Sequence, residues 1–382
     1  MTPLSILAPI RYGWTFNGPR HSRNQIERRG FLPMNRILPR FEAVTAFNPL
    51  PPRRFDLIHA FNRIPLESRP FVIGFESHLP RAYGLERTRY FQGVTAMLAH
   101  PRCRGIVAMS EHARRTFRAL HAGTAAGDTL EAKLSVRYPN LDIPDIPDAL
   151  RDAPAEPLRL TFVGAHFGRK GGCVAVKLAE LALKRGLPVE VHIVSALETG
   201  RRVWTDPPRP GFFDPYFALL DLPNVRLHHR LDNARVRQLL SRSHLCLLPT
   251  FSDTFGYSVI EAMAHWTPAI ATRQGALREF IRHRDNGILL DLPLNALGDW
   301  VHSGLPGRDT AAFEAIYRAE VERLAQESFV EIARLANAPA LLTAMRRCAR
   351  ETAVKLFDSK QASEFWDDYY QKAVFGQSRH TG

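Results

Sequence analysis

The stretch Leu248–Ala264, LPTFSDTFGYSVIEAMA, gives the clearest fold signal, because a short turn joins an apolar run to an amphipathic segment. The run ending at Leu248 predicts a buried strand, and the spacing over Tyr257–Ala264 predicts a helix that starts beside Gly256. A strand, a turn and a helix in this order are typical of the βα units of parallel sheets. We therefore expect an α/β protein.

The turn inside this stretch has the chemistry of an anion site. Asp253 comes just before the expected helix, and the N–H groups of Phe255, Gly256 and Tyr257 would point out of the helix start, where the helix dipole favours negative charge. Glu261 lies about one and a half turns further along. In a purely structural alternative, Asp253 only caps the helix and Glu261 is an ordinary helical acid.

A second motif lies between an expected strand and an expected helix, where Phe162–Gly172 reads FVGAHFGRKGG. Glycines such as Gly164 let backbone donors approach a ligand, and Arg169 and Lys170 add cations, which suits a diphosphate. The run is neither GxGxxG nor a P-loop, so it does not support a dinucleotide or ATP site. The alternative is a glycine-rich turn with an exposed cation.

Short apolar runs alternate with helical patterns along the chain, which predicts two doubly wound domains. We expect domains over 1–150 and 151–350, a proline-rich linker over Asp142–Pro157, and a helical segment over 351–382 that returns to the first domain. The expected strands are Ser5–Ile10, Asp56–Ala60, Phe71–Phe75, Gly105–Met109, Leu134–Tyr138, Leu158–Val163, Val189–Val194, Val225–Leu227, Leu245–Leu248, Ala269–Ala271 and Ile288–Leu290. The expected helices are Thr88–His100, Glu111–Leu120, Cys173–Arg185, Ala234–Ser241, Tyr257–Ala264, Leu277–His283, Asp309–Ala336 and Leu341–Ala373 with a break near Phe357–Ser359. Thr199–Pro223 is expected to be a surface loop.

Length and composition are those of a globular protein with more than one core, since 382 residues are 45% hydrophobic and 23% charged. The chain has no run of about 18 apolar residues, and Met1–Trp14 lacks the pattern of a secretion signal. The four cysteines are scattered, which favours buried thiols over disulfides or a zinc site. We therefore expect a cytoplasmic protein.

The positive charge is concentrated in the first third of the chain. Residues 1–120 hold 19 arginines, no lysine and 7 acids, a balance of +12 out of the +13 of the whole chain. Such a region would attract an anionic membrane surface, a phosphorylated substrate or nucleic acid. The alternative is a general preference for arginine, but this does not explain the asymmetry.

These motifs resemble the signature of glycosyltransferase family 4. Residues 253–264 are an acid, one residue, Phe-Gly, four residues and Glu-Ala-Met-Ala. They are followed by Thr267-Pro, by Gly275 with Glu279, and by Asn286-Gly287. The loop over 164–171 is similar to the family's Gly-x-x-x-x-x-Lys-Gly. The densest match is about forty residues long. The resemblance covers nearly the whole chain, strongly from about Leu158 to Leu290 and loosely before that.

The resemblance implies a GT-B fold, with two Rossmann-like domains facing a central cleft. It also implies a retaining, nucleotide-sugar-dependent enzyme with neither cofactor nor metal, in which Lys170 contacts the donor phosphates and Glu261 the ribose hydroxyls. Three positions depart from the pattern: Asp253 replaces the usual Glu, Ala165 replaces an Arg, and Trp266 replaces a Gly. His166 or Arg169 would supply the cation that Ala165 lacks, and Asp253 has a shorter reach toward sugar hydroxyls.

In the first domain the family often has a His near the reacting carbon, where this chain has Glu76, and His78 follows. Either side chain would orient the acceptor, and the residues do not decide between them. Asn17 and Gly18 are expected to approach the donor phosphates as the family's first-domain glycine loop does. Asn224–His229 matches the strand beside the nucleotide base, which makes His229 a donor-site candidate.

We therefore expect transfer of a sugar from a nucleoside diphosphate to an acceptor hydroxyl, in polysaccharide or lipopolysaccharide synthesis. The acceptor would be a glycan or a lipid-linked intermediate, and the enzyme would lie on the inner face of the membrane, held by its basic first domain. Nucleic acid is not an expected partner, because it would not explain the motifs of the second half. The alternatives are an epimerase or phosphorylase of the same fold, or a non-catalytic nucleotide-sugar-binding protein.

Overall fold

The computed structural model describes residues 2–10, 12–32, 42–146, 157–200 and 203–376. It divides into two compact units, one over 1–142 with 356–382 and the other over 143–355. The boundaries expected at 150 and 350 lie near these positions. Most of the expected linker, residues 147–156, lies outside the described residues.

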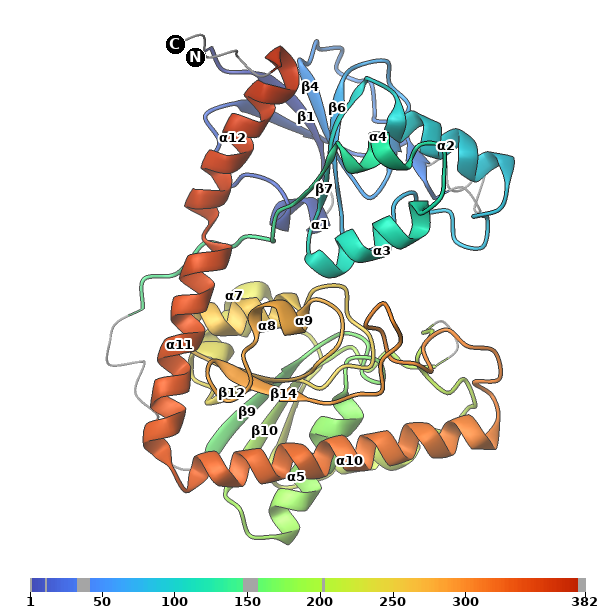
Figure 1. Cartoon of the computed structure of the whole chain (residues 1–382). Helices are drawn as coiled ribbons and strands as arrows, with labels where there is room; N and C mark the ends of the chain where they lie inside the picture. The colour runs from blue at the N-terminus through green and yellow to red at the C-terminus, as the bar shows by residue number, and fades with distance from the viewer. Residues whose placement is uncertain (1, 11, 33–41, 147–156, 201–202, 377–382) are drawn as a thin grey trace. The chain divides into compact units, whose positions relative to one another are not determined.

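The first unit contains a parallel six-stranded sheet in the order β2-β1-β4-β6-β7-β8 (Figure 1). Its strands are β1 Ser5–Pro9, β2 Gln25–Arg29, β4 Leu57–Phe61, β6 Phe71–Phe75, β7 Cys103–Ala108 and β8 Leu134–Val136, and β3 Val44–Thr45 pairs separately with β5 Ile64–Pro65. Its helices are α1 Tyr12–Phe16, α2 Arg89–Ala99, α3 Glu111–His121, α4 Gly127–Glu131 and α12 Ser359–Phe375.

Alternate strand residues of this sheet face two different layers. Ile6 and Leu57 pack with Trp366 and Tyr370 of α12, whereas residues such as Ile58 pack with the helices that cover the opposite face. This is the period-two alternation that a sheet covered on both faces requires. Helix α12 is therefore part of the first unit's core.

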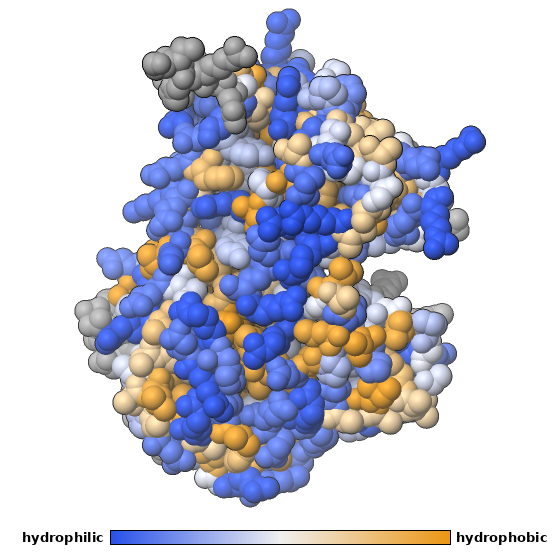
Figure 2. Space-filling model, in the orientation of Figure 1, coloured by the Kyte–Doolittle hydropathy of each residue, from blue (hydrophilic) through white to orange (hydrophobic). Residues whose placement is uncertain are grey.

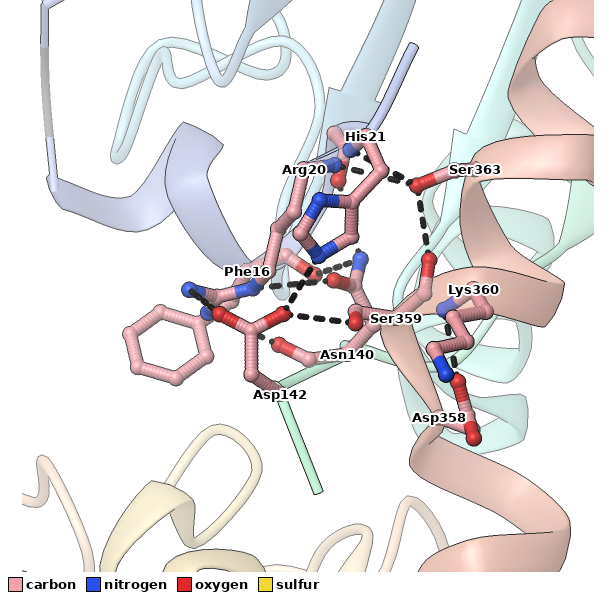
Figure 3. Close-up of polar contacts among 10 residues, drawn as sticks. Phe16, Arg20, His21, Asn140, Asp142, Asp358, Ser359, Lys360 and Ser363 are labelled. Carbon is pink, nitrogen blue, oxygen red and sulfur yellow. Dashed lines mark hydrogen bonds and ion pairs between the residues drawn. The ribbon is translucent and has the colours of Figure 1, made fainter. Parts of the chain in front are cut away.

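Polar contacts hold the start of α12 against the segment that leaves the first unit. The backbone N–H of Ser359 donates to the Leu141 carbonyl over 3.1 Å, and the Ser359 hydroxyl donates to Asp142 Oδ1 over 2.6 Å (Figure 3). Nε2 of His21 lies 2.9 Å from the same carboxylate oxygen. The two points where the chain passes between units are thus joined directly at the first unit.

The second unit contains a parallel six-stranded sheet in the order β11-β10-β9-β12-β13-β14 (Figure 1). Its strands are β9 Leu158–Val163, β10 Val189–Val194, β11 Val225–His228, β12 Leu245–Leu248, β13 Ala269–Thr272 and β14 Gly287–Leu290. Its helices are α5 Gly172–Lys184, α6 Asp214–Phe217, α7 Asn233–Ser241, α8 Tyr257–Ala264, α9 Leu277–Phe280, α10 Ala311–Ala336 and α11 Pro339–Phe357, with a 3₁₀ helix at Ala218–Asp221.

The segment Thr199–Pro223, expected to be a surface loop, is partly interior. Phe212 and Phe213 are buried there, and each makes an edge contact with Tyr317 of α10. The prediction was wrong because the apolar surface that covers these rings comes from a helix about a hundred residues later in the chain, which a local pattern does not reveal.

The strand β2 was not expected. Its sequence, QIERR, has one aliphatic residue, because it is an edge strand with solvent on one side. In the described part of the chain, no helix is both long and apolar enough to cross a membrane. Hydrophilic residues lie among the hydrophobic ones over both units on the face in Figure 2. All four cysteines are free thiols.

Candidate functional site

The strand order of the second unit creates a switch point beside β9. The chain passes from β9 to β10 and β11 on one side, and then returns to place β12 on the other side. In open parallel sheets, ligands bind outside the carboxyl ends of the strands at such a point. The loops that follow β9 and β12 are those of the two sequence motifs, so the fold brings both motifs to this edge.

Close packing explains two glycines of the loop after β9. Gly171 has a φ of +87°, and a Cβ there would lie 2.2 Å from the Pro249 carbonyl oxygen. A Cβ at Gly168 would lie 2.4 Å from Oδ2 of Asp206. A larger residue at either position would therefore separate the loop from its neighbours.

An ion pair joins the two loops. Nζ of Lys170 contacts Oδ2 of Asp253, and the two side chains are 19% and 6% exposed. Burial alone would raise the pKa of Asp253, yet the charge and hydrogen bond of Lys170, with the charge of Arg169, hold that pKa below its usual value. Asp253 is therefore a carboxylate at neutral pH.

Asp253 also occupies the approach to helix α8. Its Oδ1 accepts hydrogen bonds of 3.2 Å from the backbone N–H groups of Phe255 and Gly256. Gly256 has a φ of +93° and precedes the helix. The expectation that these two N–H groups point freely at a ligand is therefore wrong, because the protein's own carboxylate already accepts from them.

Arg169 is held by the same loop as Asp253. Its Nη1 donates to the Ser252 carbonyl over 2.9 Å. His166, the other candidate cation, has Nδ1 3.0 Å from Oε2 of Glu198. Burial and the positive charge of Arg169 lower the pKa of His166 although Glu198 opposes this, so the imidazole is neutral at pH 7. Arg169 is thus the permanently charged member of the two.

The remaining second-unit candidates lie on or near α8 and at the sheet edge. Phe255 is buried and stacks on Phe280, with ring centroids 5.2 Å apart. Tyr257 and Glu261 are half-buried on α8. His229 follows β11 and is exposed, two strands away from β9. Its contact with a nucleotide base stays a prediction.

The first unit brings Glu76 together with a residue that the sequence reasoning missed. Oε1 of Glu76 accepts from Nδ2 of Asn62 and Nη2 of Arg81, each over 3.1 Å, and Oδ1 of Asn62 accepts from the Glu76 backbone N–H over 3.1 Å. Asn62 has a φ of +60°, a conformation that Asn tolerates better than most residues. His78 instead contacts the ring of Tyr83, at 5.3 Å between centroids.

Asn17 and Gly18 are buried in the first unit. Gly74 makes room for Asn17, since a Cβ at Gly74 would lie 1.9 Å from Oδ1 of Asn17. Gly18 lies against the Trp14 ring, and its carbonyl accepts from Nδ2 of Asn140 over 2.9 Å. Both residues contribute to packing here, and their approach to donor phosphates stays a prediction.

Among the described residues, no three His, Cys, Asp or Glu side chains are grouped so that they would hold a metal ion. The switch point combines the Lys170–Asp253 ion pair, the Arg169 guanidinium and the residues that lead into helix α8.

Residues 157–298 match the family described as Glycosyl transferases group 1. The matched segment contains the loops after β9 and β12, together with Lys170, Asp253 and Glu261, so the switch-point site lies inside it.

Curated relatives each resemble less than half of the chain. A D-inositol 3-phosphate glycosyltransferase of Pseudarthrobacter chlorophenolicus is 38% identical over 172 residues, which are 44% of this chain and 37% of that protein. The enzyme of the same description from an Arthrobacter species is 29% identical over 143 residues, 36% of this chain and 32% of that protein. The matches thus span about a third of these relatives.

Solved structures resemble the chain over nearly its whole length. The structure of Anabaena HepE in complex with UDP and glucose has a TM-score of 0.60 at 13% identity, covering 96% of this chain and 99% of that one. A glycosyltransferase of Rickettsia africae has a TM-score of 0.56 at 16% identity, covering 85% and 78%. With its two parallel sheets, the chain therefore has a two-domain α/β fold of the GT-B type.

Proposed function

We propose that the chain is a retaining glycosyltransferase that moves a sugar from a nucleoside-diphosphate sugar to an acceptor hydroxyl. The observation that carries this proposal is the Lys170–Asp253 pair at the switch point, inside the segment that matches the Glycosyl transferases group 1 family. Two relatives that match part of the chain are named glycosyltransferases. HepE, which has a similar fold, was solved with UDP and glucose.

Lys170 and Arg169 are proposed to bind the donor diphosphate. Both belong to one loop and are fixed by contacts to Asp253 and Ser252, so they are already positioned when charge develops on the departing phosphate. An ammonium has three donors and can keep a carboxylate partner while it binds a phosphate oxygen. On this proposal, the charge of the leaving group is met by side chains without a metal ion.

In the proposed reaction, the bond between the sugar C1 and the phosphate oxygen breaks, and a bond from C1 to the acceptor oxygen forms on the same face. The leaving phosphate takes the acceptor proton, so no protein base is required. Asp253 holds Lys170 and accepts from sugar hydroxyls, and Glu261 binds the ribose. Glu76 or His78, at the carboxyl end of β6, would orient the acceptor.

The acceptor is proposed to be a glycan or a lipid-linked intermediate of cell-surface polysaccharide or lipopolysaccharide synthesis. Support comes from the +12 balance of residues 1–120, since a basic surface is attracted to anionic lipid by about 1 kcal/mol for each cation near it. Sedimentation with liposomes tests this part. Equal binding to neutral and anionic vesicles at low salt would remove the membrane from the proposal.

The donor is identified by thermal shift with UDP, GDP, ADP and their sugars, followed by product analysis with the stabilising sugar nucleotide. Transfer that requires an acceptor and retains the anomeric configuration supports the proposal. Nucleotide release without any acceptor would indicate an epimerase, and a requirement for inorganic phosphate would indicate a phosphorylase. Binding with no turnover under any of these conditions would indicate a non-catalytic protein.

A further inference from the structure

Trp204 lies beside the switch-point site, in the segment that was expected to be a plain surface loop. Its indole is 47% exposed. Nε1 of Trp204 donates to the Ser252 hydroxyl over 3.2 Å, and Ser252 immediately precedes Asp253. The guanidinium carbon of Arg169 lies 5.0 Å from the centroid of the Trp204 ring. One large aromatic ring thus contacts both switch-point loops.

The backbone around Trp204 is anchored from several sides. The N–H of Gly304 donates to the Trp204 carbonyl over 2.9 Å, and Nη1 of Arg308 donates to the Asp206 carbonyl over 2.7 Å. The Asp206 side chain accepts from the Gly200 N–H over 3.0 Å and lies against Gly168 of the glycine loop. Trp204 is therefore held at a defined position relative to Arg169, although its ring is half exposed.

This arrangement restricts the orientation of the Arg169 guanidinium, and its two contacts involve different parts of the group. Cation–π stacking uses the flat face of a guanidinium, whereas its N–H donors point outward in the plane of the group. In that plane, Nη1 already donates to the Ser252 carbonyl. A stacked, hydrogen-bonded arginine loses less side-chain entropy when it binds an anion, because its rotamer is fixed beforehand.

We propose that Trp204 is a positioning residue that holds Arg169 in the orientation in which it binds the diphosphate of the donor. The inference rests on the proposed function, since it assumes that a nucleoside diphosphate binds at Lys170. Trp204 acts through Arg169 in this proposal and does not itself contact the ligand. Nη1 of Arg169 donates to the carbonyl of Ser252, the residue before Asp253, so the guanidinium lies close to the proposed phosphate site.

A double-mutant cycle tests whether Trp204 acts through Arg169. Binding of UDP, GDP and ADP is measured by calorimetry for the wild type, Trp204→Ala, Arg169→Ala and the double variant. We expect Arg169→Ala to weaken binding about tenfold or more and Trp204→Ala about fivefold. The double variant should bind as weakly as Arg169→Ala alone, because Trp204 has no effect once Arg169 is absent.

Two further variants separate positioning from general damage. Trp204→Phe keeps an aromatic face under Arg169 and should restore binding to within about twofold of the wild type. Leu305→Ala, next to Gly304, removes an apolar side chain of similar exposure, 49%, and should bind like the wild type. Unfolding temperatures of all variants are measured in parallel, and a loss in Trp204→Ala that follows its unfolding temperature would overturn the inference.

The remaining outcomes distinguish this inference from the proposed function. If the losses of affinity in the two single variants multiply in the double variant, Trp204 contacts the ligand directly, which contradicts the proposal. If the wild type binds a diphosphate and both single variants bind it equally well, the inference fails and the proposed function stands. If the wild type binds none of the three nucleotides, the proposed function itself fails.

Discussion

Nζ of Lys170 contacts Oδ2 of Asp253, and this pair connects the loop after β9 to the loop after β12. The same carboxylate accepts, through Oδ1, from the N–H groups at the start of α8. One side chain therefore sets the distance between the proposed phosphate-binding lysine and the helix start. The geometry of the site depends on both members of the pair, and each can be tested separately.

Lys170→Ala is expected to reduce turnover about 100-fold or more, because a developing phosphate charge loses a preorganised partner. The matched control is Lys177→Ala. Lys177 lies on α5, is 20% exposed against 19% for Lys170, and also forms ion pairs, with Glu180 and Glu322. Initial rates with the identified sugar nucleotide check the expectation. Equal loss in the two variants would show that removing any half-buried lysine is damaging, and unchanged turnover in Lys170→Ala would remove Lys170 from the phosphate.

Asp253→Asn is expected to lower the free energy of unfolding by about 2 kcal/mol at neutral pH, because Lys170 loses a charged, hydrogen-bonded partner. The pKa of Asp253 lies below its usual value, so its carboxylate contributes stability above about pH 4. That contribution is lost as the pH falls through the folded-state pKa. Urea unfolding of both proteins is measured from pH 7 down to pH 3. The difference between their free energies of unfolding should stay constant at first and then shrink toward low pH. A difference that grows toward low pH would contradict the assignment.

The parts of the fold that were predictable are those encoded locally. Leu245–Leu248 is a buried apolar run and Leu158–Val163 is largely apolar, and the structure has strands with these bounds. Tyr257–Ala264 has the spacing of a helix and forms one. Because the carboxyl ends of parallel strands lie at one edge of the sheet, the two motif loops come together there, as the Lys170–Asp253 contact shows.

The parts that were missed depend on partners far away in the sequence. Nothing near Glu76 in the sequence indicates that Asn62 binds it, although an Asn just after a strand is a weak signal for a left-handed turn. Trp204 reads as an ordinary loop residue until the fold brings it to Arg169. The capping role of Asp253 was weighed as an alternative, but spacing alone could not show that one carboxylate accepts from the two N–H groups just before α8 and also pairs with Lys170.

Asp206→Asn is expected to change stability with the opposite pH dependence. Burial raises the pKa of Asp206 from 3.8 to about 6, although the N–H of Gly200 and the hydroxyl of Thr205 oppose this. The folded protein thus holds this proton more tightly than the unfolded chain, and the wild type loses stability as the pH rises from about 4 to about 6. Asn does not titrate, so the free energy of unfolding of the variant should rise relative to that of the wild type by about 2–3 kcal/mol over that pH window. Above the window the difference between the two proteins should stay constant.

Urea unfolding at intervals between pH 4 and pH 7 checks the Asp206 expectation. Asp253→Asn is the comparison, because its carboxylate lies in the same unit and its pKa is shifted in the opposite direction. If the two variants show the same slope against pH, the environment assigned to Asp206 is wrong. A difference between Asp206→Asn and the wild type that does not change with pH would mean that folding does not raise the pKa of Asp206.

Trp266 occupies a backbone position that favours glycine, with a φ of +62°. Non-glycine residues pay about 1–2 kcal/mol for this conformation, because Cβ approaches the following carbonyl. We therefore expect Trp266→Gly to be more stable than Trp266→Ala by about 1 kcal/mol, since both lose the stacking of Arg350 on the indole but only Gly relieves the backbone. The order of stability should reverse at Val330, an exposed residue of α10. There, Val330→Ala should be more stable than Val330→Gly by about 1 kcal/mol, because alanine favours the helix. Chemical unfolding of the four variants decides the matter, and if Ala is the more stable at both positions, Trp266 does not store the strain that its backbone angle implies.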